Sequence, residues 1–166
     1  MSLSFENTTT VVLPFLKALP NSPISLKVRG ATVSSSASSI GVQLNTQDPF
    51  TINFAAVNPS SLTKGYANHG TQVLVNSATS LELTVTYNNN GNPSARGFLD
   101  YIEIVGKKQL ISDGNQFSFR SFEQVNATGS VDFQISNSAN NSQLWDVSNP
   151  LEPKFILNES NGSTFN

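Results

Sequence analysis

The chain has 166 residues, of which 37% are apolar and 12% charged, and its formal net charge is −2. It has no Cys and a single His, which excludes disulfides, thiolate metal sites and a cysteine nucleophile and nearly excludes a His-based triad or multi-His metal site. No basic cluster is present, so nucleic acid is not an expected partner.

Uncharged polar residues dominate the composition. Asn, Ser and Thr supply 20, 24 and 13 residues, which is 57 of 166, and their side chains compete with helix formation by bonding nearby backbone. No apolar run approaches the roughly twenty residues of a membrane span, and no secretory leader is recognisable. Residues 1–3 resemble a recombinant expression start. These features predict an all-β domain cut from a larger exported protein.

The first fifth of the chain is predicted to be extended. Thr10–Leu19 has weak helical character, but Pro14 lies inside it and Pro20 ends it, so it is interpreted as an arm or an edge strand. Apolar and polar residues then alternate over 24–28, which predicts a strand. The Ser-rich stretch Ser34–Ser39 is predicted to be a loop tip or a polar strand edge.

The middle of the chain carries further period-2 patterns. Phe50–Phe54 and Val73–Val75 predict short strands, and Leu81–Tyr87 is the cleanest half-buried strand, with Tyr87 in register with its core face. His69 lies in a short polar stretch between these segments and is predicted to be an exposed loop residue rather than a metal or carbohydrate contact.

A central strand is predicted over Gly97–Ile104. Its core face would contain Phe98, Ile102 and Ile104, with Asp100 interrupting that face near its start. Further strands are predicted at 117–119, 131–135, 144–147 and 155–157.

Turn-forming residues such as Asn, Asp, Gly and Pro separate these segments. Nine or ten short strands at this spacing predict an antiparallel β-sandwich, jelly-roll-like, with a β-barrel as the alternative. The predicted organisation is one sandwich domain over residues 4–150 and a terminal strand or linker over 151–166.

Paired carboxylates in the central strand could serve acid–base chemistry or cation binding. However, Asp100 and Glu103, which flank Tyr101 and Ile102, are three positions apart and project from opposite faces of a strand unless a bulge intervenes. Asp100 is therefore predicted to bond loop backbone or an arginine, and Glu103 to face water. The candidate arginines are Arg29, Arg96 and Arg120.

Two other features could contact a ligand. The Asn-rich loop Asn88–Ala95 offers carbonyl oxygens to Ca²⁺ or sugar hydroxyls, but it has no carboxylate and is interpreted as a plain flexible loop. Trp145, the only tryptophan, is predicted to be buried beside Leu144 and Val147, in a turn that side-chain oxygens tie to backbone amides. No cofactor is expected, apart from Ca²⁺ in that loop as a minor alternative.

Several motifs follow one another between Leu81 and Pro150. A Leu-x-Leu-x-Val-x-Tyr strand and a polar loop precede Gly97–Ile104, which reads Gly-Phe-Leu-Asp-Tyr-Ile-Glu-Ile. A basic-apolar step at Lys107–Leu110 and a phenylalanine-arginine strand at Gln116–Arg120 follow.

The series closes with Trp-Asp-Val-Ser-Asn-Pro at 145–150, where Ser148 stands in place of the commoner Thr. In this order the motifs resemble the region upstream of the catalytic domain in gingipain-like (C25) cysteine peptidases, above all PorU-type sortases of the type IX secretion system. Before residue 81 the resemblance is limited to the strand pattern. The signature residues are Leu99, Asp100, Tyr101, Ile102, Glu103, Trp145, Asp146, Asn149 and Pro150.

The resemblance implies a non-catalytic accessory domain that positions the catalytic domain or its substrate. The family's catalytic His and Cys belong to the later domain, so no catalytic residue is assigned here. It also implies a Bacteroidetes-type bacterium, a cell-surface, outer-membrane or secreted location, and a downstream catalytic domain as partner. Protein substrates or secretion-system components are further implied partners.

Two alternatives remain. A carbohydrate-binding module fits a sandwich with Asn-rich loops, although the sequence shows no exposed aromatic pair. A stand-alone hydrolase would need a nucleophile motif or two converging acids, and neither is evident.

Overall fold

A computed structural model describes residues 3–5, 8–13, 15, 17–121, 124, 128–129, 132–139 and 143–157. These residues contain ten β-strands and no helix. The chain divides into two compact units, Met1–Lys108 (unit 1) and Gln109–Asn166 (unit 2). No helix long and apolar enough to cross a membrane occurs in the described ranges.

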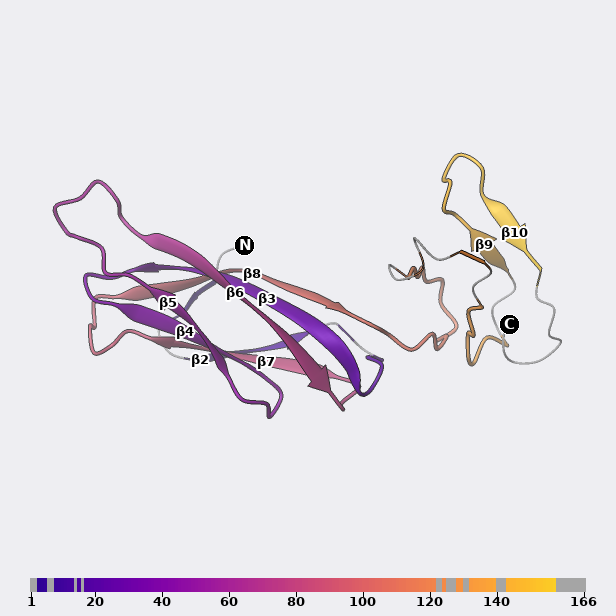
Figure 1. Ribbon diagram of the computed structural model, residues 1–166, viewed down its shortest axis with the longest axis horizontal. Coiled ribbons are helices and arrows are strands. Elements are labelled where there is room, and N and C mark those ends of the chain that lie inside the picture. Colours follow the sequence, from indigo (N-terminus) through magenta and orange to yellow (C-terminus); the bar gives the residue numbers. More distant parts are fainter. Residues whose placement is uncertain are drawn as a thin grey trace. The chain divides into compact units, whose positions relative to one another are not determined.

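Unit 1 is a sandwich of two four-stranded antiparallel sheets (Figure 1). Sheet A has the order β1 (Leu3–Phe5), β8 (Arg96–Gly106), β3 (Ser22–Val33), β6 (Tyr66–Asn76). Sheet B has the order β2 (Thr8–Leu13), β7 (Leu81–Asn88), β4 (Ser38–Leu44), β5 (Phe50–Phe54). Most pairs of consecutive strands lie in different sheets, and the resulting strand order is that of a jelly roll. The predicted antiparallel sandwich is confirmed, and the barrel alternative is wrong because neither sheet closes on itself.

Alternation along the strands builds the core between the sheets. In β4 every second residue is buried, and β7 buries Leu81, Leu83, Val85 and Tyr87 while the residues between them face outward. Because side chains of a strand point alternately to its two faces, the period-2 pattern in the sequence is sufficient to define this core. The predicted core position of Tyr87 is confirmed by its exposure of 5%.

A β-bulge in β8 changes which residues of that strand face the core. Tyr101 pairs with Arg29 and Leu99 pairs with Gly30, so Asp100 stands between them without a counterpart on β3. The extra residue reverses the alternation, and Leu99 before it faces inward just as Ile104 does after it. The prediction that Phe98 lies on the core face is therefore wrong, because Leu99 takes that position and Phe98 faces outward, half-buried.

Close approach of the sheets at the bulge requires glycine at residue 30. A Cβ placed there would lie 2.5 Å from the Ile40 Cδ1 atom and 3.0 Å from the Phe98 carbonyl oxygen. Because Gly30 has no side chain, β3 can approach Ile40 and the Phe98 backbone closely and still keep its regular alternation of buried and outward-facing residues.

The described part of unit 2 contains one hairpin, formed by β9 (Leu144–Asp146) and β10 (Lys154–Ile156). An isolated parallel bridge joins Ile111 to Ser136. The strand predicted at 117–119 is wrong: Phe117 and Phe119 lie in irregular structure, where the Phe119 ring packs edge-on against Phe133 at 5.2 Å. Of the strand predicted at 131–135, residues 132–134 are irregular, and residue 131 lies outside the described residues.

The division of the chain differs from the single sandwich predicted over residues 4–150. The strands of both stacked sheets end at Gly106, and the chain from Gln109 onward belongs to unit 2. The physical reason is that the later apolar residues pair with one another rather than extending either sheet, as the β9–β10 hairpin shows.

Candidate functional site

The outer face of sheet A carries the polar residues of the central strand. Asp100 forms an ion pair with Arg29 at 3.3 Å, and the Lys27 Nζ atom lies 5.8 Å from the centre of the Tyr101 ring. Glu103 pairs with Lys27 across the β3–β8 register. Arg29 is thus the partner that Asp100 takes among the three candidate arginines.

The prediction that Asp100 and Glu103 lie on opposite faces is wrong. The bulge at Asp100 brings Tyr101 and Glu103 to the outer face, where both pair with outward-facing residues of β3. Both carboxylates are exposed to water, and each lies beside a basic residue, Arg29 for Asp100 and Lys27 for Glu103. This arrangement is a solvated network of opposite charges, which contributes little to stability.

His69 lies in strand β6 opposite Arg29, not in a loop as predicted. Its side chain is exposed as expected, and its backbone N–H donates to the Asn68 Oδ1 atom at 2.9 Å. Among the described residues, no group of three or more His, Cys, Asp or Glu side chains could hold a metal ion.

The Asn-rich loop between β7 and β8 uses its side-chain oxygens on its own backbone. The Oδ1 atoms of Asn88, Asn89 and Asn92 accept the backbone N–H groups of residues 90, 91 and 94 at 2.9 to 3.0 Å. Each bond closes an Asx turn. Three backbone N–H groups of the loop are therefore bonded by its own side chains, and these three oxygens are already engaged.

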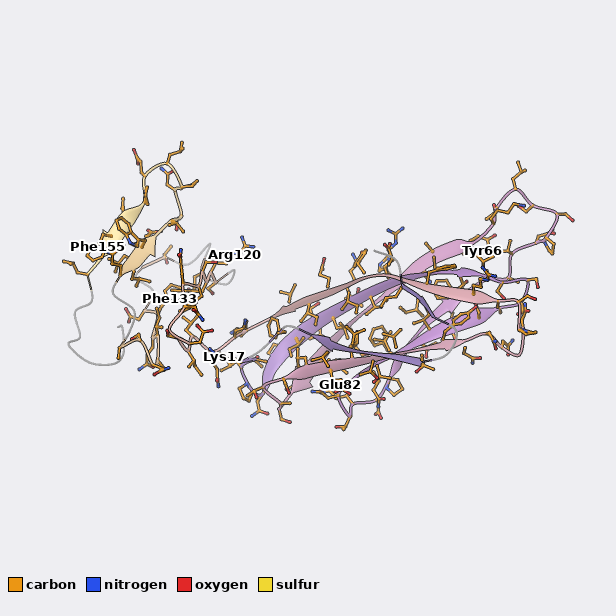
Figure 2. The ribbon with its side chains drawn as sticks, turned by 180° about the vertical axis from the view of Figure 1, so that it is seen from behind. Lys17, Tyr66, Glu82, Arg120, Phe133 and Phe155 are labelled. Atoms are coloured by element: carbon orange, nitrogen blue, oxygen red, sulfur yellow. The ribbon has the colours of Figure 1, made fainter. Side chains whose placement is uncertain are left out.

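The β9–β10 hairpin places the only tryptophan on an exposed surface. Trp145 pairs with Phe155 across the strands, with the ring centres 5.5 Å apart and the planes at 67°, an edge-to-face contact. Trp145 is 48% exposed and Phe155 47%, so the predicted burial of Trp145 is wrong. The Trp145 Nε1–H donates to Gln143 Oε1 at 3.1 Å, which satisfies the indole locally. Phe155 is labelled on this hairpin in Figure 2.

The turn of the hairpin contains the closing motif of the series, Trp-Asp-Val-Ser-Asn-Pro at 145–150. Asp146 Oδ1 accepts the Ser148 backbone N–H at 2.9 Å, and Asn149 Oδ1 accepts that of Leu151 at 3.2 Å. The hydrogen bonds from Ser148, side chain first and backbone second, hold the pKa of Asp146 below its ordinary value. Pro150 follows Asn149 at the tip. The predicted hydrogen bonds between side-chain oxygens and backbone amides of this turn are therefore confirmed.

Apolar side chains surround the aromatic pair along this segment, and they stand out from the mainly polar composition of the chain. Among residues 144–157, the exposed large apolar side chains are Trp145, Val147, Leu151, Phe155, Ile156 and Leu157. We call this set the hairpin surface. Trp145 and Phe155 lie on one face of the hairpin and Ile156 on the other. Exposed apolar side chains gathered on one small element commonly mark an interaction site, which makes the hairpin surface the leading candidate site.

Comparison with known proteins yields a structural likeness only. No protein-family profile and no curated protein sequence matches the chain. The fold is similar to the crystal structure of dimeric latent PorU from Porphyromonas gingivalis, with a TM-score of 0.74 and 20% sequence identity over 99% of this chain. The chain spans 16% of the length of that protein.

A second solved structure, the EclA C-terminal domain, a sugar-binding protein, gives a TM-score of 0.41 and 11% identity. The alignment covers 63% of this chain and 77% of that domain. A likeness of this size carries no weight for either fold or function.

Proposed function

We propose that this chain is a non-catalytic accessory region of a PorU-like, gingipain-like cysteine peptidase of the bacterial cell surface or secreted fraction. The region would position the catalytic domain or its protein substrate. The hairpin surface is the single observation that carries this proposal, because its exposed aromatic and aliphatic side chains need a partner to cover them.

Two other observations support it. The motif order between Leu81 and Pro150 resembles that of the family, and the fold likeness to PorU extends over 99% of this chain, so it includes both units. A cysteine peptidase requires a Cys nucleophile and a His base. The chain has no Cys and only one His. Those residues would come from another part of the parent protein.

The first test is the coding sequence that follows Asn166. We expect it to encode a caspase-like α/β domain with a His and a Cys. A stop codon at that point would contradict the proposal. In parallel, the purified chain is expected to leave fluorogenic peptide substrates uncleaved, and robust proteolysis that scales with its concentration would also overturn the proposal.

The second test follows docking directly. Because Trp145 is the only tryptophan, the chain labelled with 5-fluorotryptophan gives one ¹⁹F resonance from the hairpin surface. Adding the unlabelled catalytic domain is expected to shift or broaden that resonance.

Leu151→Ser and Leu157→Ser, which change residues that are 90% and 73% exposed, are expected to weaken this effect. Leu62→Ser is the matched control, since Leu62 is an equally exposed apolar residue of unit 1 at 95%. Equal effects of all three variants would argue against docking through the hairpin surface.

A carbohydrate-binding module is the second candidate function, and the exposed Trp145–Phe155 pair favours it. Aromatic faces at the surface can stack on sugar rings, and Tyr66 is also 41% exposed, near the end of sheet A seen in Figure 2. Tyr87 is excluded from such a role because it is buried. Binding on a glycan array that is lost in Trp145→Ala would support this function, and a blank array would argue against it.

A further inference from the structure

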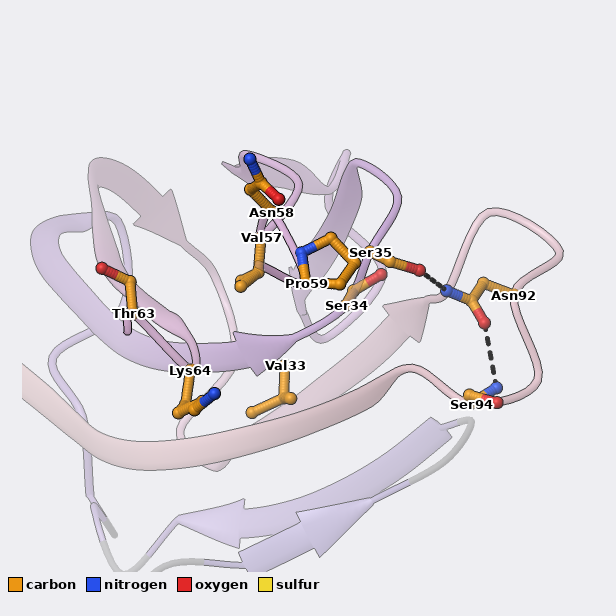
Figure 3. A pocket seen from close by; sticks show the side chains of 10 residues that line it. All are labelled: Val33, Ser34, Ser35, Val57, Asn58, Pro59, Thr63, Lys64, Asn92 and Ser94. Carbon is orange, nitrogen blue, oxygen red and sulfur yellow. Dashed lines mark hydrogen bonds between the residues drawn. The ribbon is translucent and has the colours of Figure 1, made fainter. Parts of the chain in front are cut away.

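One end of the unit 1 sandwich contains a pocket between three loops. Residues 34–37, 55–65 and 89–95 connect β3 to β4, β5 to β6 and β7 to β8, and they gather at the same end of the sandwich in Figure 1. The cavity between them has a volume of about 230 Å³ and ten lining residues (Figure 3). It is smaller than the roughly 300–1,000 Å³ of pockets for drug-sized ligands, so it would accept one small group.

Hydrogen bonds within and between the loops hold the walls of this pocket in the absence of a ligand. Asn58 Oδ1 accepts the Ser60 backbone N–H at 2.9 Å, and Asn92 Oδ1 accepts that of Ser94 at 3.0 Å. The Asn92 side-chain nitrogen also donates to Ser35 Oγ at 3.2 Å, which joins two of the loops (Figure 3). The walls are preorganised, and preorganisation lowers the entropic cost of binding.

The same bonds leave the pocket with an excess of hydrogen-bond donors. The amide oxygens of Asn58 and Asn92 are engaged by the loop backbone, whereas the Asn58 side-chain nitrogen and the Thr63 and Ser94 hydroxyls make no hydrogen bond within the described part of the chain. Lys64 adds an ammonium group. The Asn58 nitrogen and the Lys64 ammonium can only donate, whereas the two hydroxyls can donate or accept. A ligand with several acceptors would complement all four groups.

Lys64 is the one charged residue among the ten that line the pocket. Its Nζ atom donates to the Ser61 carbonyl oxygen at 3.4 Å, which is at the long end for a hydrogen bond. No carboxylate lies within ion-pair distance of Lys64 among the residues that the structure describes. The positive charge of the pocket is therefore not neutralised by the protein.

The remaining wall is aliphatic. Val33, Val57 and Pro59 supply it, and none of the ten lining residues is aromatic. The pocket thus lacks the flat stacking surface that sugar rings favour, but it can contact a short branched chain. Positive charge, surplus donors and an aliphatic wall together define the ligand.

We propose that this pocket binds the carboxylate of a small aliphatic acid, such as the C-terminal residue of an extended peptide. The Lys64 ammonium pairs with the carboxylate in a charge-assisted hydrogen bond. The surrounding hydroxyl and amide donors take its remaining lone pairs, and the aliphatic body rests against Val33, Val57 and Pro59. This site lies within unit 1 and is independent of the hairpin surface.

The test is an NMR titration of the ¹⁵N-labelled full chain with N-acetyl-L-valine. We expect millimolar binding, with amide shifts confined to the three loops. N-acetyl-L-valinamide has the same shape without the charge and is expected to bind several-fold more weakly. Isovalerate distinguishes the source of the carboxylate, since equal binding means a free acid suffices and weaker binding means that a peptide terminus is preferred.

Two variants locate the interaction. Lys64→Gln is expected to weaken binding of N-acetyl-L-valine roughly tenfold, the loss of one charge-assisted bond. Lys154→Gln removes an equal charge from unit 2 and is expected to change nothing. Equal binding of the acid and the amide, an unaltered affinity in Lys64→Gln, or the absence of loop shifts would each overturn the proposal, as would stronger binding of glucuronate than of the aliphatic acids.

Discussion

Gly97 shows how a single missing side chain positions the core. A Cβ at this residue would lie 2.7 Å from Cγ of the Tyr87 ring, and that ring is packed in the core with 5% exposure. Gly97→Ala is expected to lower the free energy of unfolding by about 1–3 kcal/mol, the usual cost of overpacking. Urea denaturation would measure this change.

Gly41 provides the matched control. A Cβ there meets only the Thr86 carbonyl oxygen at 3.8 Å, an ordinary contact. Gly41→Ala is therefore expected to be neutral or stabilising by up to about 1 kcal/mol, because alanine loses less backbone entropy in a strand. Equal destabilisation by both variants would show that backbone effects, and not the Tyr87 ring, decide the outcome.

Asp146 has a lowered pKa in the folded chain because of its hydrogen bonds from Ser148. A group with a depressed folded pKa stabilises the fold above its unfolded pKa, and the contribution is lost as the pH falls through the folded value. The hairpin turn is thus expected to loosen only under acid conditions. In a carboxyl ¹³C titration, Ser148→Ala should raise the pKa of Asp146, and Ser148→Thr should leave it low. An unchanged pKa in Ser148→Ala would contradict the assigned cause.

At the scale of the element, the bulge in β8 contains one residue, Asp100, that has no counterpart on the partner strand β3. Deleting Asp100 keeps every other side chain on its present face and removes a surface ion pair, so we expect a cost below about 2 kcal/mol. Circular dichroism during urea unfolding would measure it.

The matched deletion removes Lys27, which also faces outward but lies in the regular strand β3. Losing one residue there turns either Leu26 or Val28 away from the core. That deletion is expected to cost more than about 4 kcal/mol or to prevent folding. Similar effects of the two deletions would contradict the prediction that the bulge residue can be removed without turning other side chains of β8 to the opposite face.

At the scale of the whole molecule, the two units differ in how much core they contain. The buried members of the core cluster all lie within residues 24–99 of unit 1, whereas Ile135 is the one buried hydrophobic side chain among the described residues of unit 2. Burial of apolar surface is the main favourable term in folding. Unit 1 therefore buries enough apolar surface to fold on its own, whereas the described part of unit 2 buries little.

Truncation after Lys108 tests this difference. The shortened chain is expected to unfold cooperatively with nearly the same thermal midpoint as the full chain, and Gln109–Asn166 alone is expected to show no cooperative transition. Differential scanning calorimetry would measure both. Loss of folding in the shortened chain would show that unit 1 depends on unit 2.

Much of the sandwich could be predicted from local pattern. Leu81–Tyr87 alternates without interruption, and its strand, faces and core tyrosine are all as predicted. The first part of β6 was missed because Asn68 and Gly70 give it no apolar alternation, and its pairing with β3 defines it as a strand. The opposite error occurred at Phe117 and Phe119, which alternate but have no strand beside them.

The candidate sites were less accessible to sequence reasoning. The sequence places Leu144 and Val147 beside Trp145, which suggested burial, but exposure depends on whether another layer covers the hairpin. The loop-end pocket combines residues from three separate loops, from Val33 to Ser94. No motif marks it, and its one local signal is Lys64, a lone basic residue in a loop without acids.

The sequence by itself determined the all-β character, the alternating core and the side-chain hydrogen bonds in the turn after Trp145, because each depends on residues within a few positions of one another. It also determined that no cysteine chemistry takes place here. Only the tertiary structure decided that Asp100 is a bulge residue beside Arg29, that Trp145 is exposed and that three loops enclose one pocket. These properties depend on strand register and on contacts between distant segments, and the period of a local pattern contains no information about either.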